Sequence, residues 1–243
     1  MKLVIEKSVT VLTPTMGNPL VRFAIDSVEN QTYKCNHLLV ADGRQARNDL
    51  FNLNIKPYGD TVVVTPENTG ANGFYGHRIY AAYPHLVNSD YILFLDEDNW
   101  LEPNHVETLI ETIEDNQLDF SYSLRKIYDK QGNYICDDNA ESLGGWPIWF
   151  THDNPQYHVD TSSYCFKREF LIQCCHIWHH GWGADRRFFN AVKKASRHAT
   201  SGKHTLCYRL DGNTGSVTKD FFDEGNQKQL EIYNGVLPWL NVS

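Results

Sequence analysis

The chain has 243 residues, of which 41% are hydrophobic and 21% charged, and this composition is typical of a folded globular protein. The formal net charge of −8 argues against binding to long nucleic acid, which requires a basic surface. The six cysteines form no Cys-x-x-Cys pair, and neither a signal peptide nor an apolar run of about 18 residues is found, so we expect a cytoplasmic protein without stable membrane insertion.

Strands and helices are predicted to alternate over the first half of the chain. Runs of β-branched and apolar residues predict the strands, and apolar residues at helical spacing predict the helices. The predicted strands span residues 8–13, 37–41, 61–65 and 91–95, and the predicted helices span residues 19–30, 74–86 and 104–115. This alternation, with nearly continuous apolar strands, indicates a mostly parallel sheet covered by helices on both faces.

The second half of the chain is less regular. Strands at residues 120–129 and 134–136 flank the turn sequence Lys130-Gln131-Gly132-Asn133, which predicts an antiparallel hairpin. A loop rich in Gly, Pro and Trp is expected at residues 144–157. Short strands are predicted at residues 164–166 and 205–210, and helices at residues 167–175, 185–196 and 227–233.

The strongest functional signal is the acidic sequence Asp96-Glu97-Asp98, which directly follows the apolar strand at residues 91–95. Asp96 and Asp98 can share one hard cation, Mg²⁺ or Mn²⁺, which binds one or two carboxylates and completes its coordination with water and substrate phosphates. The alternative interpretation is an acidic loop that caps the next helix. Two other polar segments, Thr13-Pro14-Thr15 and Asp42, also follow predicted strands. Because ligands bind beyond the carboxyl ends of such strands, all three segments are expected on one rim.

With these elements in this order, the chain resembles family 2 glycosyltransferases of the GT-A fold over about residues 8–210. The similar segments are TVLTPTMGNPLVRFAIDSVENQTY, LLVADG, ILFLDEDNWLEPNHVETL and HVDTSSYCFKREFL. A fifth segment, HHGWGADRRFF, is similar to the Trp-Gly-x-Glu-Asp element of β-1,4-galactosyltransferases. The resemblance implies a Rossmann-like α/β fold with a mostly parallel sheet and a small hairpin. We expect one domain over residues 1–243, with a nucleotide-binding part at about 8–115 and an acceptor part at about 116–243.

The resemblance also implies roles on the donor side of the site. Asp98, helped by Asp96, would hold the metal on the donor diphosphate, and His204 would be a third metal ligand. Asp42 would form a hydrogen bond with the base or the ribose of the nucleotide. The loop at Thr13, Pro14 and Thr15 would contact the nucleoside, and Arg78 would contact the diphosphate. A surface or strand-edge histidine is the alternative for His204.

On the acceptor side, the resemblance implies that Asp185 is the catalytic base and that Trp182 walls the sugar site. The alternative for Asp185 is a residue of the first helical turn, favoured there by the helix dipole. Trp146 and Trp149 lie in the predicted Gly-rich loop and are candidates to stack on an acceptor sugar, although packing explains them equally well. The family's Glu-Asp pair is Ala184-Asp185 here, which leaves the identity of the acceptor open.

The sequence therefore predicts a metal-dependent, inverting glycosyltransferase, with hexosyl transfer from a UDP-sugar to an acceptor hydroxyl. The sugar, the nucleotide, the linkage and the acceptor stay open. One alternative is a non-catalytic carbohydrate-binding protein on the same fold, suggested by the missing first acid of the Glu-Asp pair. Another is an Asp-x-Asp phosphohydrolase with Asp96 as nucleophile, which the late position of the motif and the nearby Trp100 disfavour.

Overall fold

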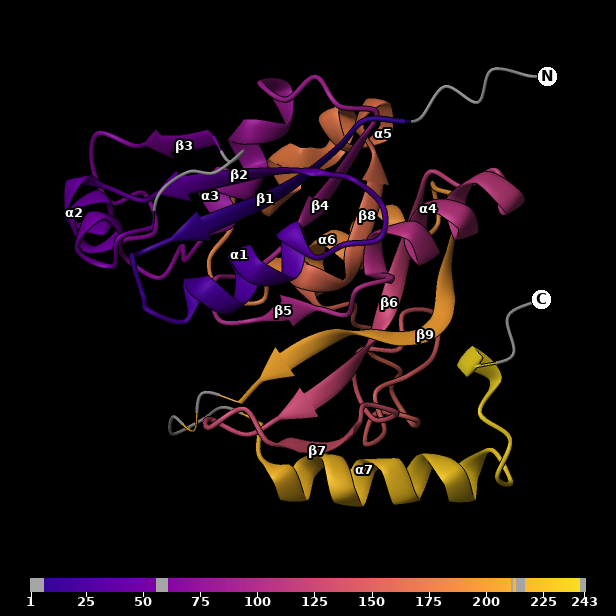
Figure 1. The fold of residues 1–243 in the computed structure, drawn as a ribbon. Coiled ribbons are helices and arrows are strands. Elements are labelled where there is room, and N and C mark those ends of the chain that lie inside the picture. Colours follow the sequence, from indigo (N-terminus) through magenta and orange to yellow (C-terminus); the bar gives the residue numbers. More distant parts are fainter. Residues whose placement is uncertain (1–6, 56–60, 211, 213–216, 241–243) are drawn as a thin grey trace.

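The computed structural model describes residues 7–55, 61–210, 212 and 217–240. Within these residues, nine strands form one sheet in the order β3-β2-β1-β4-β8-β6-β9-β5, and β7 pairs with β6 outside this order (Figure 1). Helices pack on both faces of this sheet. The same residues contain no helix that is both long and apolar enough to cross a membrane.

One half of the sheet is parallel, as the sequence predicts. Its strands are β1 (Val9–Thr15), β2 (Asn36–Ala41), β3 (Thr61–Val64) and β4 (Tyr91–Phe94). The accompanying helices are α1 (Val21–Glu29), α2 (Arg44–Asn52), α3 (His77–Ala82) and η1 (Tyr83–His85). Every residue of β1 and of β4 is buried, as expected for strands that are covered on both faces.

The other half of the sheet is mixed. Its strands are β5 (Trp100–Leu101), β6 (Phe120–Tyr128), β7 (Tyr134–Asp137), β8 (Tyr164–Lys167) and β9 (His198–Arg209). Its helices are α4 (His105–Asn116), η2 (Thr161–Ser163), α5 (Arg168–Cys174), η3 (Cys175–Trp178), α6 (Ala184–Val192), α7 (Lys219–Ile232) and η4 (Pro238–Leu240). The antiparallel pairing of β6 with β7 confirms the predicted hairpin.

Several predicted boundaries are wrong. The strand β1 continues through Pro14 to Thr15, whose carbonyl oxygen accepts the backbone N–H of Asp42. The helix α2 is not predicted because its sequence is mostly polar and it buries only Ala46 and Leu50. The strand β9 starts seven residues earlier than predicted, and α7 starts eight residues earlier. Pairing with β6 supports the polar start of β9, and sequence patterns carry no information about such a partner.

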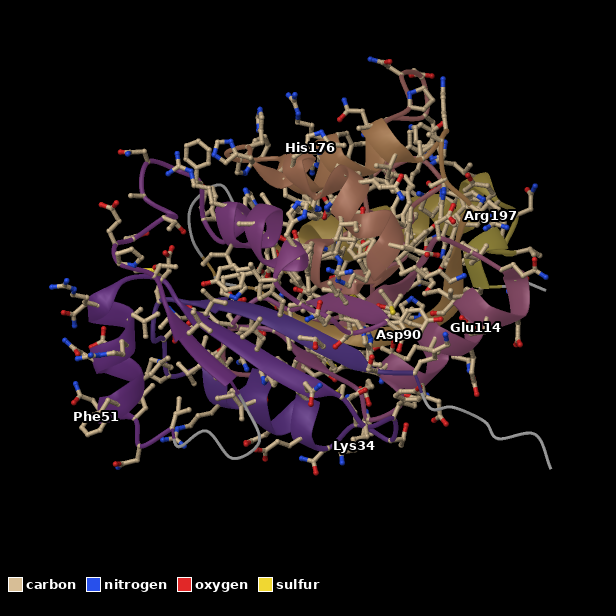
Figure 2. The ribbon with its side chains drawn as sticks, turned by 90° about the horizontal axis from the view of Figure 1, so that it is seen from above. Lys34, Phe51, Asp90, Glu114, His176 and Arg197 are labelled. Atoms are coloured by element: carbon tan, nitrogen blue, oxygen red, sulfur yellow. The ribbon has the colours of Figure 1, made fainter. Side chains whose placement is uncertain are left out.

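The core occupies both faces of the sheet. On one face, Leu12 of β1 and Phe94 of β4 belong to an apolar cluster with residues of α3, α5 and α6. On the other face, Val11 of β1 belongs to a cluster with residues of α1 and α4. In the view from above, Phe51 of α2 lies at the periphery, and it is 81% exposed (Figure 2). The two clusters hold the sheet between its helices and bring the ends of β1, β2 and β4 to one rim.

Candidate active site

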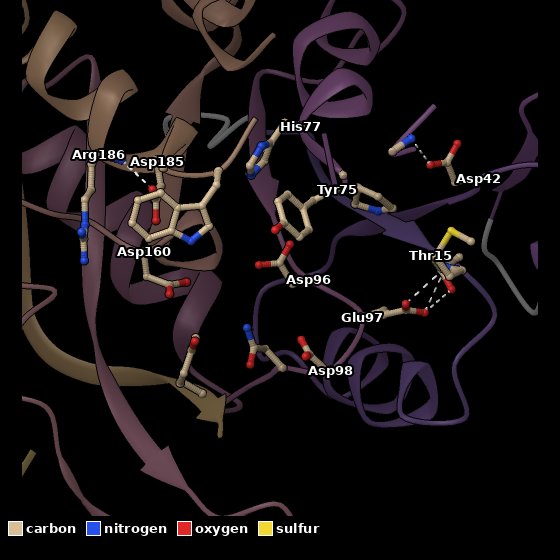
Figure 3. Close-up of a pocket in the computed structure, with 18 of the residues that line it drawn as sticks. Thr15, Asp42, Tyr75, His77, Asp96, Glu97, Asp98, Asp160, Asp185 and Arg186 are labelled. Atoms are coloured by element: carbon tan, nitrogen blue, oxygen red, sulfur yellow. Dashed lines mark hydrogen bonds between the residues drawn. The ribbon is translucent and has the colours of Figure 1, made fainter. Parts of the chain in front are cut away.

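A cleft of about 640 Å³ opens where β1, β2 and β4 end (Figure 3). Loops from the second half of the chain form its other wall, where Figure 3 shows Asp185 across the pocket from Asp98. Among the described residues, the sequence-predicted ones that line the cleft are Pro14, Thr15, Asp42, Asp96, Asp98, Trp182 and Asp185. The predicted residues outside its lining are Thr13, Arg78, Trp146, Trp149 and His204.

Asp42 follows β2 and builds one wall of the cleft. Its Oδ1 accepts the backbone N–H of Thr69 at 2.7 Å and the hydroxyls of Thr69 at 2.9 Å and Thr65 at 3.1 Å, and its Oδ2 accepts the backbone N–H of Gly70 at 2.8 Å. A side chain at position 70 is excluded, because its Cβ would lie 2.3 Å from the carbonyl oxygen of Tyr75. Asp42 therefore shapes the loop beside the rim, in addition to lining the cleft itself.

Glu97, the middle residue of the acidic triplet, ties two rim loops together. Its Oε2 accepts the hydroxyl of Thr15 at 2.5 Å and the backbone N–H groups of Met16 at 3.2 Å and Asn18 at 3.1 Å. Burial raises the pKa of Glu97, although these hydrogen bonds oppose the shift. This role cannot be predicted from local patterns, because Thr15 and Glu97 are 82 residues apart in the sequence.

Asp96 sits in a strongly negative environment. Its carboxylate accepts the hydroxyl of Tyr80 at 2.8 Å and the hydroxyl of Ser162 at 3.2 Å. Burial raises the pKa of Asp96 to about 8, and the negative charges of Asp98 and Asp160 add to this effect. A cation bound beside these side chains would stabilise their ionised forms.

The donor set at Asp96 and Asp98 fits a hard divalent cation. Within the described part of the chain, no group of three or more His, Cys, Asp or Glu side chains is arranged to hold a metal ion. Two carboxylates suffice for Mg²⁺ or Mn²⁺ when water and substrate phosphates complete the shell. His204 lies on β9, where its Nδ1 is 3.8 Å from Oδ2 of Asp137 and burial lowers its pKa.

Asp185 is presented at the first turn of α6. Gly183 precedes this helix with φ +79°, a left-handed conformation that favours glycine. Oδ1 of Asp185 accepts the backbone N–H of Arg186 at 2.7 Å, and Oδ2 lies 2.7 Å from Nε2 of His158. Burial alone would raise the pKa of Asp185, but the charge and hydrogen bond of His158 outweigh it and hold the pKa well below its usual range.

An ionic cluster forms part of this wall, and its members Arg125, Glu141, Asp160 and Arg186 line the cleft. Arg125 of β6 has a side chain that is 1% exposed, and its guanidinium contacts Asp138 at 2.7 Å, Glu141 at 2.9 Å and Asp160 at 3.0 Å. Arg186 contacts the other oxygen of Glu141 at 2.8 Å. The sequence gives no signal for this cluster, because its members come from four separate segments with no motif in common.

Aromatic residues stand at the mouth of the cleft. Trp182 is 75% exposed, and its ring centroid lies 5.7 Å from the guanidinium of Arg186. Tyr75 is 57% exposed and adopts φ +52°, an unusual backbone conformation for a bulky residue. Exposed aromatic rings beside a polar cleft are suited to stack on the apolar face of a sugar ring.

The other predicted aromatic residues pack elsewhere. Trp146 contacts Trp239 with ring centroids 5.9 Å apart, and Trp149 contacts Phe221 at the same centroid separation. Both belong to small apolar clusters beneath α7 and the C-terminal segment. Their predicted stacking on an acceptor sugar stays a prediction.

Thr13 and Arg78 lie just outside the cleft lining. Thr13 is buried, with its hydroxyl 2.9 Å from Nε2 of His37. The guanidinium of Arg78 lies 3.6 Å from the ring centroid of Phe74, and its Nη1 donates to the carbonyl oxygen of Thr69. Arg78 thus stabilises the rim loop that Asp42 also holds.

Comparison with known proteins identifies the class. The profile of the family "Glycosyl transferase family 2" matches residues 10–174, which is more than half of the chain, and the chain belongs to this family. A Haemophilus influenzae protein described as uncharacterized is 28% identical, with 38% of this chain and 74% of that protein aligned. Glycosyltransferase GlyA of Streptococcus pneumoniae is 23% identical, over 58% of this chain and 19% of GlyA.

Solved structures confirm the predicted GT-A fold. S. aureus TarS 1–349 in complex with UDP-GlcNAc superposes with a TM-score of 0.63 at 14% identity, over 93% of this chain and 67% of TarS 1–349. Its complex with UDP gives a TM-score of 0.59 at 16% identity, over 93% of this chain and 66% of the other. The chain spans about two thirds of TarS 1–349 and about a fifth of GlyA.

Proposed function

We propose that this chain transfers a sugar from a UDP-sugar to an acceptor hydroxyl. Membership of glycosyltransferase family 2 supports glycosyl transfer from a nucleotide-sugar donor. The choice of UDP is supported by the similar TarS structures, which contain UDP and UDP-GlcNAc. Their identities of 16% and 14% are too low to transfer the sugar or the acceptor to this chain.

One observation carries this proposal: a single cleft contains both the acidic strand end and a further carboxylate, that of Asp185, on its opposite wall. Asp96 and Asp98 lie on the wall built by the parallel strands, and Asp185 lies on the other wall. The cleft volume of about 640 Å³ falls in the usual range for small-molecule sites. A nucleotide-sugar lying between the walls would have its diphosphate near Asp96 and Asp98 and its sugar near Asp185.

In the proposed reaction, the acceptor hydroxyl oxygen attacks the anomeric carbon of the donor. The bond between that carbon and the diphosphate oxygen breaks, and its electron pair leaves with the nucleoside diphosphate. Asp185 accepts the hydroxyl proton, a contribution of about 10²–10⁴-fold in rate for a well-placed base. Its depressed pKa keeps Asp185 ionised at neutral pH. A single displacement of this kind inverts the anomeric configuration.

Asp96 and Asp98 would hold Mg²⁺ or Mn²⁺ in this proposal. When bound, such a cation neutralises the negative charge that develops on a diphosphate leaving group. The raised pKa of Asp96 supports this role, because burial and the negative charges of Asp98 and Asp160 disfavour its ionised form, which a bound cation would stabilise. His204 does not line the cleft. Its role as a third metal ligand is therefore supported by the resemblance alone.

The first test is calorimetric titration of UDP, with and without Mn²⁺, followed by hydrolysis of UDP-glucose, UDP-galactose and UDP-GlcNAc. We expect Asp98→Asn to abolish metal-dependent UDP binding. We expect Asp185→Asn to bind UDP normally and to lose turnover. Asp153→Asn, at an exposed position outside the cleft, is the matched control. Absence of binding to any sugar nucleotide, or a product with retained anomeric configuration by NMR, would contradict the proposal.

A further inference from the structure

We propose that His158 is a positioning residue for the transfer reaction, which holds the Asp185 carboxylate both as a hydrogen-bond donor and as a positive charge, while Glu141 holds the imidazole from its other side. This role rests on the proposed function of Asp185 as the base. It gives a function to the ionic cluster in the wall that carries Asp185.

The contact geometry immobilises the carboxylate before any substrate binds. Nε2 of His158 lies 2.7 Å from Oδ2 of Asp185, and the His158 side chain is only 5% exposed. The other oxygen, Oδ1, accepts the backbone N–H of Arg186 at 2.7 Å. Each carboxylate oxygen keeps lone-pair capacity for a further donor, such as an acceptor hydroxyl. Orientation of the base is therefore set by the protein, which removes that ordering step from the reaction.

The backbone around His158 is fixed by a close approach of three segments. The carbonyl oxygen of His158 accepts the backbone N–H of Gly144 at 2.8 Å. Gly144 has φ +65°, and a Cβ at this position would lie 2.0 Å from the hydroxyl oxygen of Tyr122. Only glycine allows this packing, and it holds the imidazole under the base.

The surroundings of the second ring nitrogen, Nδ1, favour the protonated and positively charged form of the His158 imidazole. Nδ1 of His158 is buried, has no hydrogen-bond partner among the described residues, and lies 3.9 Å from Oε2 of Glu141. With Nε2 directed at Asp185, an unprotonated Nδ1 would place a lone pair near a second carboxylate. A proton on Nδ1 turns this repulsion into attraction. The ring thus lies between two carboxylates that both stabilise the imidazolium.

The surrounding charges agree with this assignment. The charged groups that face the imidazole are Asp185 and Arg186 of α6, Glu141 of the loop after β7, Arg125 of β6, and Asp160 of its own loop. Both arginines are already paired with Glu141, and Arg125 also pairs with Asp160 and Asp138. Burial alone would lower the pKa of His158, but Asp185 first, and then Glu141, raise it above its ordinary value of 6.5.

Removal of this positive charge has a specific consequence for the base. Burial alone raises the pKa of Asp185, and His158 is the main group that reverses this shift. Without the imidazolium, the pKa of Asp185 should rise above about 4. The carboxylate would then take up a proton within the pH range in which turnover can be measured. Because only the ionised carboxylate can accept a proton, turnover should then fall as the pH is lowered. In the intact protein, protonation of Asp185 should cause no fall in turnover over the same pH range.

The test measures kcat from pH 4.5 to 8 with saturating UDP-sugar and Mn²⁺. His158→Gln keeps an amide donor near Nε2 and removes the charge. We expect its kcat at pH 8 to stay within about threefold of the wild type, and a new acid limb to appear below about pH 6. His158→Ala removes the donor as well, and we expect a loss of about 100-fold at pH 8 and a larger loss at lower pH, with the UDP affinity unchanged.

A matched control is His152→Gln in the same loop, where the side chain contacts Gln229 and does not line the cleft. It should leave both kcat and the pH profile unchanged. Asp185→Asn, measured in parallel, separates the two proposals. If Asp185→Asn retains turnover, the proposed base is wrong. If Asp185→Asn is inactive and the pH profile of His158→Gln overlays the wild type, the role of His158 is wrong.

A second measurement needs no folded variant of His158. NMR titration of the ¹⁵N-labelled histidine rings in the wild-type chain should show one ring that deprotonates above pH 6.5. Asp185→Asn should lower the pKa of that same ring by more than one unit, because the interaction is reciprocal. A His158 ring that titrates at or below pH 6.5 would overturn the inference directly.

Discussion

Replacement of Arg125 by Met should strongly destabilise the fold. The guanidinium is 1% exposed and pairs with Asp138, Glu141 and Asp160, so Arg125→Met removes a cation that contacts all three carboxylates. Removal of one partner from a buried ion pair costs about 3–5 kcal/mol in the free energy of unfolding. Three backbone N–H groups still bind Asp138, which places the expected loss near the lower end, about 3 kcal/mol.

This destabilisation should depend on pH in a defined direction. Burial alone would raise the pKa of Asp138 and Glu141, but the charge of Arg125, with that of His158 acting on Glu141, holds both below their ordinary values. The stability that these carboxylates contribute is present above about pH 4 and is lost as the pH falls through their folded-state pKa values. In Arg125→Met, burial without the cation disfavours the ionised carboxylates. Their protonation at lower pH therefore reduces the loss in the free energy of unfolding. The gap to the wild type should therefore be largest near pH 7 and should shrink towards pH 5.

The assay is urea unfolding, followed by tryptophan fluorescence, at pH 7, 6 and 5. Lys126→Met is the control, because Lys126 is the next residue on β6 and forms an ion pair with Glu102 at 2.7 Å that is about 30% exposed. We expect the control to lose no more than about 1 kcal/mol. A loss below about 1 kcal/mol for Arg125→Met, or a gap that widens as the pH falls, would refute this reasoning.

Three further outcomes are expected. Glu97→Ala frees the loop at Thr15, so UDP affinity measured by calorimetry should fall about tenfold, while Glu107→Ala on α4, outside the cleft lining, should leave it unchanged. Gly70→Ala should lower the unfolding midpoint by several degrees, because its Cβ would lie 2.3 Å from a backbone oxygen; an unchanged midpoint would argue against the described loop. Trp182→Ala should leave stability within about 0.5 kcal/mol, since the side chain is 75% exposed, but should raise KM for the acceptor; unaltered acceptor kinetics would exclude stacking there.

The parallel half of the sheet was predictable because its signals are local. Each strand is a short apolar run, and residues such as Asp42 and Asp96 interrupt it where the chain leaves the core. Burial on both faces favours apolar residues, so the first charged side chain marks the strand end. The helix α2 escaped prediction for the opposite reason, since it buries only two side chains and its sequence has little apolar periodicity.

The sequence by itself determined the fold family and the rim that carries Asp96, Asp98 and Asp42, because strand ends and motifs are local in the chain. Only the tertiary structure decided how these residues are held and what faces them. The contacts of Glu97 with Thr15 and of His158 with Asp185 join residues 82 and 27 positions apart. Such contacts depend on how separate elements pack, and side-chain spacing along one chain does not encode them.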